Sequence, residues 1–308
     1  MNVLELEDLT AAQVSGCIDT AIEWKASPDA VPALLTGQTW ALVFEKPSAR
    51  TRISTECAVR SLGGEAIVLR GDEVGIGTRE RADDVARTLA TYCSAIAARV
   101  YDHEHLVTFA DAVSVPILNL LSDRAHPCQA LADVLTIREL LGGLEGVRVA
   151  YVGDGNNVAS SLAFAAGLTG FELVVASPSS FALDEDVVAR ARNLGGHIER
   201  TSDPQEAVRG ADVVYTDTWI SMGDEEETAL RRTAFAGYCV DTELLTVAGP
   251  DALVMHCLPA HRGEEITDAV IDGPQSRVWQ QAENRFHATR ALLALLSGQS
   301  EGGAGWPA

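Results

Sequence analysis

Lysine is nearly absent from this chain of 308 residues. Lys25 and Lys46 are the only two, so arginine supplies the other side-chain cations. Acidic residues outnumber basic ones by 44 to 23, and the net charge is -21. A surface of this kind repels nucleic acid and anionic membranes, so neither is expected as a partner.

The surplus of acidic residues favours a protein adapted to a salty cytoplasm. At 1 M salt the Debye length is roughly 3 Å, so the repulsion between surface carboxylates is screened. In dilute buffer the same fold should be weakened. The alternative is an acidic protein whose genome favours arginine codons and which has no need of salt.

Cysteine is also scarce, and none of the six cysteines has C-x-x-C spacing. Neither a disulfide framework nor a zinc knuckle is therefore indicated. We expect most of these thiols to be buried, with Cys257 the exception.

No apolar run is long enough to span a bilayer, and the first residues are acidic where a secretion signal would be basic. These absences predict a cytoplasmic protein without membrane contact.

Apolar runs rich in Val, Ile and Ala alternate with longer stretches of helical period, which is typical of parallel sheets with helices on both faces. After one series of strands a long helix over 128–141 ends at Gly142, and a second series begins. The restart predicts an α/β protein with two doubly wound parallel-sheet domains joined by that helix, with a last helix over 283–296 and a loose tail. The candidate strands are 40–44, 66–69, 95–99, 115–119, 147–152, 172–176, 197–200, 213–216 and 253–255.

Polar residues suited to an anion follow the first strand. Ser48, Ala49, Arg50 and Thr51 lie where a helix is expected to begin, so free N–H groups, two hydroxyls and a guanidinium converge there. A phosphate fits this group best. The alternative is a capped helix with solvated arginines.

Two later strand ends add Arg99 and the run His126, Pro127, Cys128 and Gln129. A neutral His126 can donate to a carbonyl oxygen and Gln129 offers an amide, so the pair can orient a carbamoyl group. Alternatively, the two residues have only a structural role, because Pro127 suits the first position of a helix and His126 can cap that helix.

A glycine turn after the strand over 147–152 resembles half of a dinucleotide fingerprint. Val158 replaces its third small residue, and the next strand ends without a carboxylate for a ribose. Nicotinamide binding is therefore not expected. Asn156 and Asn157, at the start of the following helix, can instead bind an α-carboxylate.

The last two strands of the second series also end in polar residues. Asp217, with Ser221 and Met222 in the loop after it, can hold an α-ammonium group. Cys257, followed by Leu258, can place a thiol beside a reacting amine. Alternatively, the polar residues at each of these strand ends only cap the strand and face solvent in the loop.

Taken together, the motifs resemble the aspartate/ornithine carbamoyltransferase family over almost the whole chain. They are S-x-R-T-R from Ser48, H-P-C-Q from His126, G-D-G-N-N from Gly153, D-x-W-x-S-M-G from Asp217, H-C-L-P from His256 and A-E-N-R from Ala282. The resemblance implies transfer of the carbamoyl group of carbamoyl phosphate to the side-chain amine of L-ornithine, giving L-citrulline and phosphate. It implies no metal and no cofactor.

The resemblance also implies roles for single residues. It makes Cys257, Arg50, His126 and Asp217 catalytic. The implied ornithine-binding residues are Asn157, Asp217, Ser221 and Met222. Those implied for carbamoyl phosphate are Ser48, Ala49, Arg50, Thr51, Arg99, His126, Pro127, Cys128, Gln129, Cys257, Leu258 and Arg285.

The same resemblance implies a carbamoyl phosphate-binding domain over 1–140, an ornithine-binding domain over 141–282 and a segment over 283–308 whose helix returns to the first domain. It further implies a homotrimer or a multiple of trimers. Gly75 stands where many family members have a glutamine that reaches a neighbouring subunit. Two other functions remain open: a carbamoyltransferase for putrescine or N-acetylornithine, and a non-catalytic protein that binds anions or amino acids.

Overall fold

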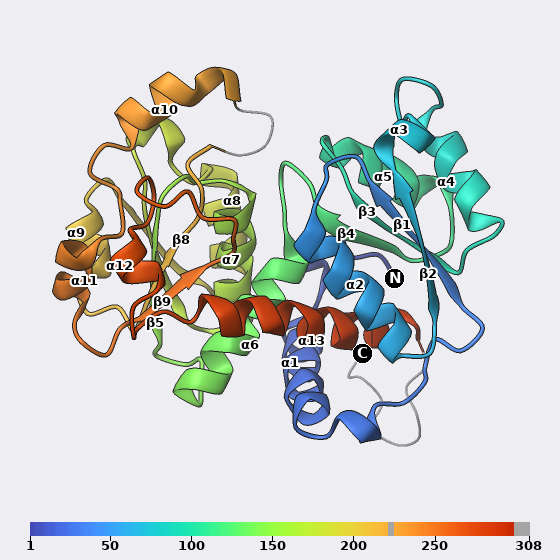
Figure 1. The fold of residues 1–308 in the computed structure, drawn as a ribbon, viewed down its shortest axis with the longest axis horizontal. Helices are drawn as coiled ribbons and strands as arrows, with labels where there is room; N and C mark the ends of the chain where they lie inside the picture. Colours follow the sequence, from blue (N-terminus) through green and yellow to red (C-terminus); the bar gives the residue numbers. More distant parts are fainter. Residues whose placement is uncertain (221–224, 299–308) are drawn as a thin grey trace. The chain divides into compact units, whose positions relative to one another are not determined.

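The computed structural model of this protein describes residues 1–220 and 225–298. The chain forms two compact units, one of Met1–Leu135 with Asn284–Ala308 and one of Thr136–Glu283. Both boundaries fall within helices, α6 (Pro127–Leu141) and α13 (Val278–Leu296) (Figure 1).

A four-stranded parallel sheet in the order β2-β1-β3-β4 forms the centre of the first unit. The central strands β1 and β3 are almost wholly apolar and buried, whereas the edge strand β2 is half exposed. Burial on both faces explains why the central strands read as continuous apolar runs. The strands are β1 (Thr39–Phe44), β2 (Glu65–Arg70), β3 (Ala95–Arg99) and β4 (Ile117–Leu121).

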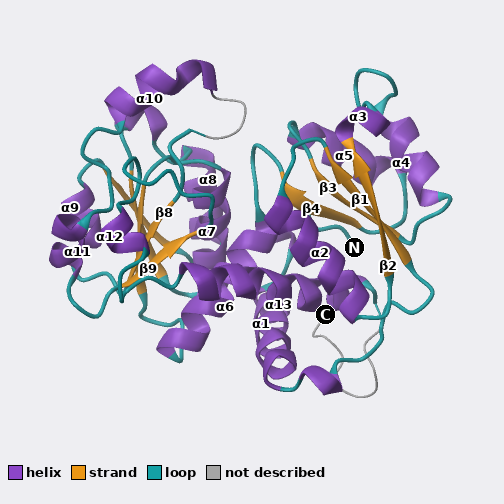
Figure 2. Cartoon of the chain, viewed as in Figure 1, coloured by secondary structure: helices purple, strands orange, loops and turns teal. Residues whose placement is uncertain are grey.

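Helices surround this sheet (Figure 2). Several begin at side-chain caps: Thr10 and Gln13 form a capping box, and Asp102 accepts from the N–H of Glu104. Gly75 ends α3 at a φ of 67°, and a Cβ there would lie 2.6 Å from that of Arg79. Besides α6 and α13, the helices are α1 (Ala11–Ala26), α2 (Ala49–Ser61), α3 (Gly71–Val74), α4 (Ala82–Ala90) and α5 (His103–Ala112).

The second unit has a five-stranded parallel sheet in the order β7-β6-β5-β8-β9. The chain thus leaves the central strand β5 in one direction and returns to its other side, as in doubly wound folds. The strands are β5 (Arg148–Val152), β6 (Glu172–Ala176), β7 (His197–Thr201), β8 (Val213–Thr216) and β9 (Leu253–His256).

An apolar core of this unit joins the sheet to the helices that follow β7, β8 and β9. Phe235 lies in that core and stacks on Trp219, with their ring centroids 5.5 Å apart. The helices are α7 (Asn157–Thr169), α8 (Glu185–Asn193), α9 (Pro204–Val208), α10 (Thr228–Ala234), α11 (Thr242–Ala248) and α12 (Asp268–Ile271).

The predicted class, with two parallel-sheet α/β domains, is confirmed, but two elements differ from expectation by more than one residue at an end. Strand β4 runs over Ile117–Leu121 and not 115–119, because Pro116 has no N–H to donate to the ladder. Helix α13 begins at the buried Val278, one turn before the expected position 283. Within 1–220 and 225–298, no helix is long and apolar enough to cross a membrane.

Candidate active site

In the first unit, the carboxyl ends of β1 and β3 bring the predicted site residues around Ser48 and Arg99 together. Phe44 pairs with Arg99 in the ladder, and the N–H of Glu45 donates to the carbonyl of Arg99 at 2.9 Å. The turn that leads to Ser48 therefore begins beside Arg99, the last residue of β3. Ligands in open parallel sheets bind at this edge.

Helix α2 begins at Ser48, whose Oγ accepts from the N–H of Thr51 at 3.3 Å. Ala49 and Arg50 are exposed in the first turn, while Thr51 is buried. Unpaired N–H groups and the helix dipole favour an anion at this end. The exposed Arg50 guanidinium adds a full positive charge to the same helix end.

Arg285, a buried residue of α13, connects two of the predicted segments. It donates through Nη1 to Oε1 of Gln129 at 2.5 Å and through Nη2 to Oγ1 of Thr51 at 3.1 Å. The amide of Gln129 is fixed on its other side, since Nε2 donates to Asp133 at 2.7 Å. Helices α2, α6 and α13 thus share one cationic group.

His126 directly precedes α6 and is only 4% exposed. Burial lowers the pKa of this imidazole well below its usual range, and the positive charges of Arg285 and Arg99 lower it further. His126 is therefore neutral at pH 7, and a neutral imidazole can donate one hydrogen bond without adding charge.

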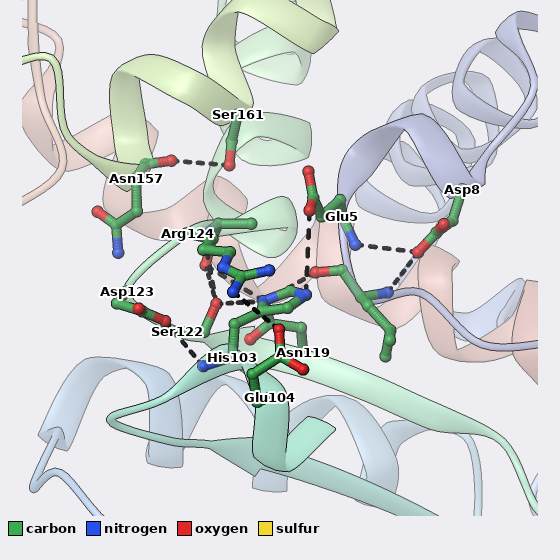
Figure 3. Close-up of polar contacts among 12 residues, drawn as sticks. Glu5, Asp8, His103, Glu104, Asn119, Ser122, Asp123, Arg124, Asn157 and Ser161 are labelled. Atoms are coloured by element: carbon green, nitrogen blue, oxygen red, sulfur yellow. Dashed lines mark hydrogen bonds and ion pairs between the residues drawn. The ribbon is translucent and has the colours of Figure 1, made fainter. Parts of the chain in front are cut away.

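The turn before His126 is held by buried hydrogen bonds (Figure 3). Nδ2 of Asn119 donates to the carbonyl of Ala125 at 3.3 Å and to Oγ of Ser122 at 3.1 Å. The same Oγ lies 2.7 Å from Nδ1 of His103 and accepts from the N–H of Ala125 at 3.2 Å. These contacts fix the path of the chain into His126.

Pro127 and Cys128 contribute differently from their neighbours. Pro127 is the first residue of α6, where its missing N–H costs no hydrogen bond. The Cys128 thiol is buried, which raises its pKa to about 11, and Sγ lies 3.6 Å from the carbonyl of Asn119. The Cys128 side chain thus points into the protein, and only its backbone remains for a ligand.

In the second unit, the neighbouring strands β8 and β9 end together, with Thr216 opposite His256. The residues that follow these two strands are in contact: Sγ of Cys257 donates to Oδ1 of Asp217 at 2.8 Å. Asp217 is only 5% exposed and Cys257 is half-buried. A thiol and a carboxylate therefore form one polar group at the edge of the sheet.

Asn156 was predicted from the sequence to bind an α-carboxylate, but the structure shows its side chain bonded within the protein. Its Oδ1 caps α7 by accepting from the N–H groups of Val158 and Ala159, and its Nδ2 donates to Oδ2 of Asp217 at 2.9 Å. Its place before a helix was a signal for the cap but not for the bond to Asp217. Both oxygens of that carboxylate are thus held.

Asn157 is the first residue of α7, and its carbonyl accepts from the hydroxyl of Ser161 at 2.9 Å (Figure 3). Its backbone is therefore part of the helix. Ser221 and Met222, the other two residues expected to bind ornithine, lie outside the described residues.

Leu258 is the one non-glycine residue of the described part with a positive φ, at 60°. This conformation is costly for a branched side chain and is common at functional sites. Its N–H donates to Nδ1 of His256 at 2.8 Å, and Nε2 of His256 lies 3.0 Å from Glu265. Donor atoms of Asp217, His256 and Cys257 lie within 4.8 Å of one another, but a metal bound there would have to break one of these His256 bonds.

Two family models match the chain: the carbamoyl-P binding domain of aspartate/ornithine carbamoyltransferase over 1–139 and the Asp/Orn binding domain over 145–296. The fold and these two domains define a transferase with separate carbamoyl-P and amino-acid binding domains. The chain belongs to the aspartate/ornithine carbamoyltransferase family.

The similar proteins narrow the class further. Ornithine carbamoyltransferase from Acidothermus cellulolyticus is 51% identical over 307 residues, which cover 98% of this chain and 97% of that one. Anabolic ornithine carbamoyltransferase from Pyrococcus furiosus is 48% identical over 306 residues, 96% of each chain. A solved structure of the P. furiosus ornithine carbamoyltransferase has a TM-score of 0.93 at 47% identity, covering 97% of this chain and 98% of that one. The predicted family and enzyme class are confirmed.

Proposed function

We propose that this protein transfers the carbamoyl group of carbamoyl phosphate to the side-chain amine of L-ornithine, giving L-citrulline and phosphate in arginine biosynthesis. The observation that carries the proposal is the 2.8 Å contact between Sγ of Cys257 and Asp217. A carboxylate held by a thiol and an amide attracts an ammonium group and can orient the amine that it becomes.

The first unit binds carbamoyl phosphate. Arg50 and the N–H groups after Ser48 hold the phosphate, where charge increases as the carbon–oxygen bond breaks. Neutral His126 donates to the carbamoyl oxygen, and Gln129 orients the carbamoyl amide. The remaining members of this set are Ala49, Thr51, Arg99, Pro127, Cys128 and Arg285, and in the second unit the backbone of Cys257 and Leu258.

The second unit binds ornithine. Asn157, Asp217, Ser221 and Met222 hold the amino-acid end. The side-chain amine has an ordinary pKa near 10.4, so the site must select or generate its neutral form. Cys257, with Asp217, orients that amine for attack on the carbamoyl carbon, and the leaving phosphate takes its proton. No step requires a metal or an organic cofactor.

The domains follow the same division, with carbamoyl phosphate bound by 1–140, ornithine by 141–282, and 283–308 completing the first domain. The active form is a homotrimer or a multiple of trimers in a salty cytoplasm. The surplus of acidic residues, 44 against 23 basic ones, supports the adaptation to salt. Light scattering and activity in dilute buffer and in molar KCl test these two statements.

The test of the activity is product formation from carbamoyl phosphate with ornithine, putrescine, N-acetylornithine or aspartate offered separately. We expect citrulline from ornithine, with little product from the other amines. Putrescine lacks both groups that Asn157 and Asp217 would bind, so its turnover would reassign those residues. Absence of product with every amine, in both salt conditions, would overturn the proposal.

A further inference from the structure

A chain of hydrogen bonds, buried at His256 and Glu265 and exposed at His261, connects the two strand ends that carry Asp217 and Cys257. Its centre is Glu265, which has no exposed surface. Oε1 of this residue accepts from the backbone N–H of His261 at 2.6 Å and lies 3.0 Å from Nε2 of His256.

His256 continues the chain toward Leu258. Because Nδ1 accepts from the N–H of Leu258 at 2.8 Å, that nitrogen cannot carry a proton, and the ring proton is on Nε2. Nε2 therefore donates to Glu265. The orientation of the ring is fixed from both sides, and the ring in turn fixes the N–H of Leu258.

The other branch runs toward Asp217. Nδ1 of His261 lies 2.9 Å from Oγ1 of Thr218, the residue after Asp217. Oγ1 of Thr218 also donates to the carbonyl of Ile220 at 3.1 Å. Leu258, His256, Glu265, His261 and Thr218, called the Glu265 network below, thus connect the backbone on either side of the Cys257–Asp217 contact.

This network is costly for stability alone. A buried carboxyl group needs partners for both oxygens, and among the described residues Oε2 of Glu265 has none. Replacing such a group together with its partners by apolar side chains of similar volume often leaves stability unchanged or raises it. Leu258 adds strain, since its φ is 60°. The network instead maintains the geometry at Cys257 and Asp217.

We propose that Glu265 and His256 are positioning residues for the amine-binding group of Cys257 and Asp217. Glu265 fixes the His256 ring, the ring fixes the backbone of Leu258, and this backbone aims the Cys257 thiol at Asp217. The inference rests on the proposed function, in which that group orients the amine of ornithine. Neither residue touches a substrate in this assignment.

A pair of substitutions at His256 separates its two bonds. In His256→Asn, Oδ1 replaces Nδ1 and still accepts from Leu258, but the bond to Glu265 is lost. In His256→Gln, an amide near the position of Nε2 still reaches Glu265, but the bond to Leu258 is lost. We expect kcat/KM for ornithine to fall roughly tenfold to hundredfold in His256→Gln and less in His256→Asn, because misplacement by about 1 Å costs up to a hundredfold.

Two substitutions at Glu265 test its part in the same way. Glu265→Gln keeps a carbonyl oxygen for His256 and His261, so kcat/KM should fall by no more than about threefold. Glu265→Leu leaves the N–H groups of His256 and His261 without their acceptor, so thermal stability should fall, and kcat/KM should fall at least about tenfold and by more than that loss explains. Gln275→Leu is the matched control, because it removes bonds to Gly249 and Ala252 at the opposite, amino end of β9.

A readout that does not need turnover keeps the inference separate from the proposed function. In a Cys57→Ala background, which removes an exposed thiol, the alkylation rate of Cys257 by iodoacetamide reports the Cys257–Asp217 contact. We expect that rate to change severalfold in Glu265→Leu and to stay near the parent value in Glu265→Gln.

A parent protein that makes no citrulline would refute the proposed function, while the alkylation rates would still decide the positioning. Unchanged alkylation and unchanged kcat/KM in Glu265→Leu would overturn the inference. So would losses of kcat/KM in Glu265→Leu and Gln275→Leu that simply follow their losses of thermal stability.

Discussion

Charged neighbours of opposite sign act on one buried titratable residue in each unit, His126 in the first and Tyr151 in the second. In the first, burial and then the charges of Arg285 and Arg99 lower the pKa of His126. In the second, burial and then the charges of Asp217, Asp154 and Cys257 raise the pKa of Tyr151 well above its usual range. Burial disfavours the charged form of each group, and the neighbours add to that effect with opposite charge. These charges agree with the proposal that the first unit binds a phosphate and the second an ammonium group.

The units also differ in how their charged groups are assembled. Arg285 lies 234 positions from Thr51 and 156 from Gln129 along the chain. In the second unit, Asp217 and Cys257 meet because two neighbouring strands end side by side. The cationic site therefore depends on helices distant in sequence, and the acidic site depends on the sheet itself.

The largest effect is expected from removing a positive charge in the first unit. Arg50→Met removes an exposed guanidinium at the start of α2, and kcat/KM should fall by about 10² to 10³, as for other groups that stabilise charge in a transition state. Thermal stability should hardly change. Arg52→Met, an exposed neighbour that pairs with Glu56, is the control. Equal activity of the two variants would contradict the role of Arg50.

The matching change on the acidic side is Asp217→Asn, which keeps the shape and removes the charge. KM for ornithine should rise by roughly 10², while KM for carbamoyl phosphate stays within about threefold, since charge-assisted bonds are the stronger ones. Steady-state kinetics with each substrate varied in turn measure both values. Asp212→Asn, at the other end of β8, is the control, because its carboxylate is exposed and accepts from the N–H of Arg148. A rise in both KM values would indicate damage to the fold instead.

The lowered pKa of His126 predicts that the stability of the protein depends on pH. Its pKa is lowered in the folded state, so below its ordinary value of 6.5 the unfolded chain binds the additional proton. The stability contributed by this residue is complete above pH 6.5 and falls by about 1.4 kcal/mol per pH unit as the pH drops toward the folded-state pKa. Urea denaturation of the parent and of His126→Gln between pH 7.5 and 5 measures the difference. A difference that is independent of pH would disprove the assignment.

The smallest effect is expected when one cysteine of each unit, Cys128 or Cys257, is replaced by alanine. Cys128→Ala should cost about 1 kcal/mol of stability, because a buried group is removed, and leave turnover within about threefold, because its side chain points into the protein. Cys257→Ala should lower turnover and alter its pH dependence. Full turnover of Cys257→Ala at every pH would remove the thiol from the mechanism.

Much of the fold could be predicted from the sequence, because burial on both faces makes the strands of a parallel sheet read as apolar runs. Strands over Ala95–Arg99, Glu172–Ala176 and Val213–Thr216 have the predicted bounds. The error at β4 comes from Pro116, which was counted within the strand although it cannot donate to the ladder.

The candidate site was less predictable, because its contacts join residues with no relation in sequence spacing. Nothing in the sequence around Asn156 indicates that one amide both caps α7 and donates to Asp217. Glu265 was missed for a related reason, since a carboxyl group in a polar stretch gives no sign that it is buried under His256. The motifs gave the candidates, and only the coordinates give the hydrogen bonds among them.

The position of Arg285 on α13 has a consequence for synthesis on the ribosome. Domains generally fold in order from the N-terminus as the chain emerges. The first unit includes Asn284, which accepts from Lys25 at 2.7 Å, and Arg285, which joins α2 to α6. The sheet of that unit emerges early, but its anion site can be completed only after all of the second unit has been translated. If Arg285 binds carbamoyl phosphate as proposed, a nascent chain released before position 285 lacks a complete carbamoyl phosphate site, however well its first 135 residues have folded.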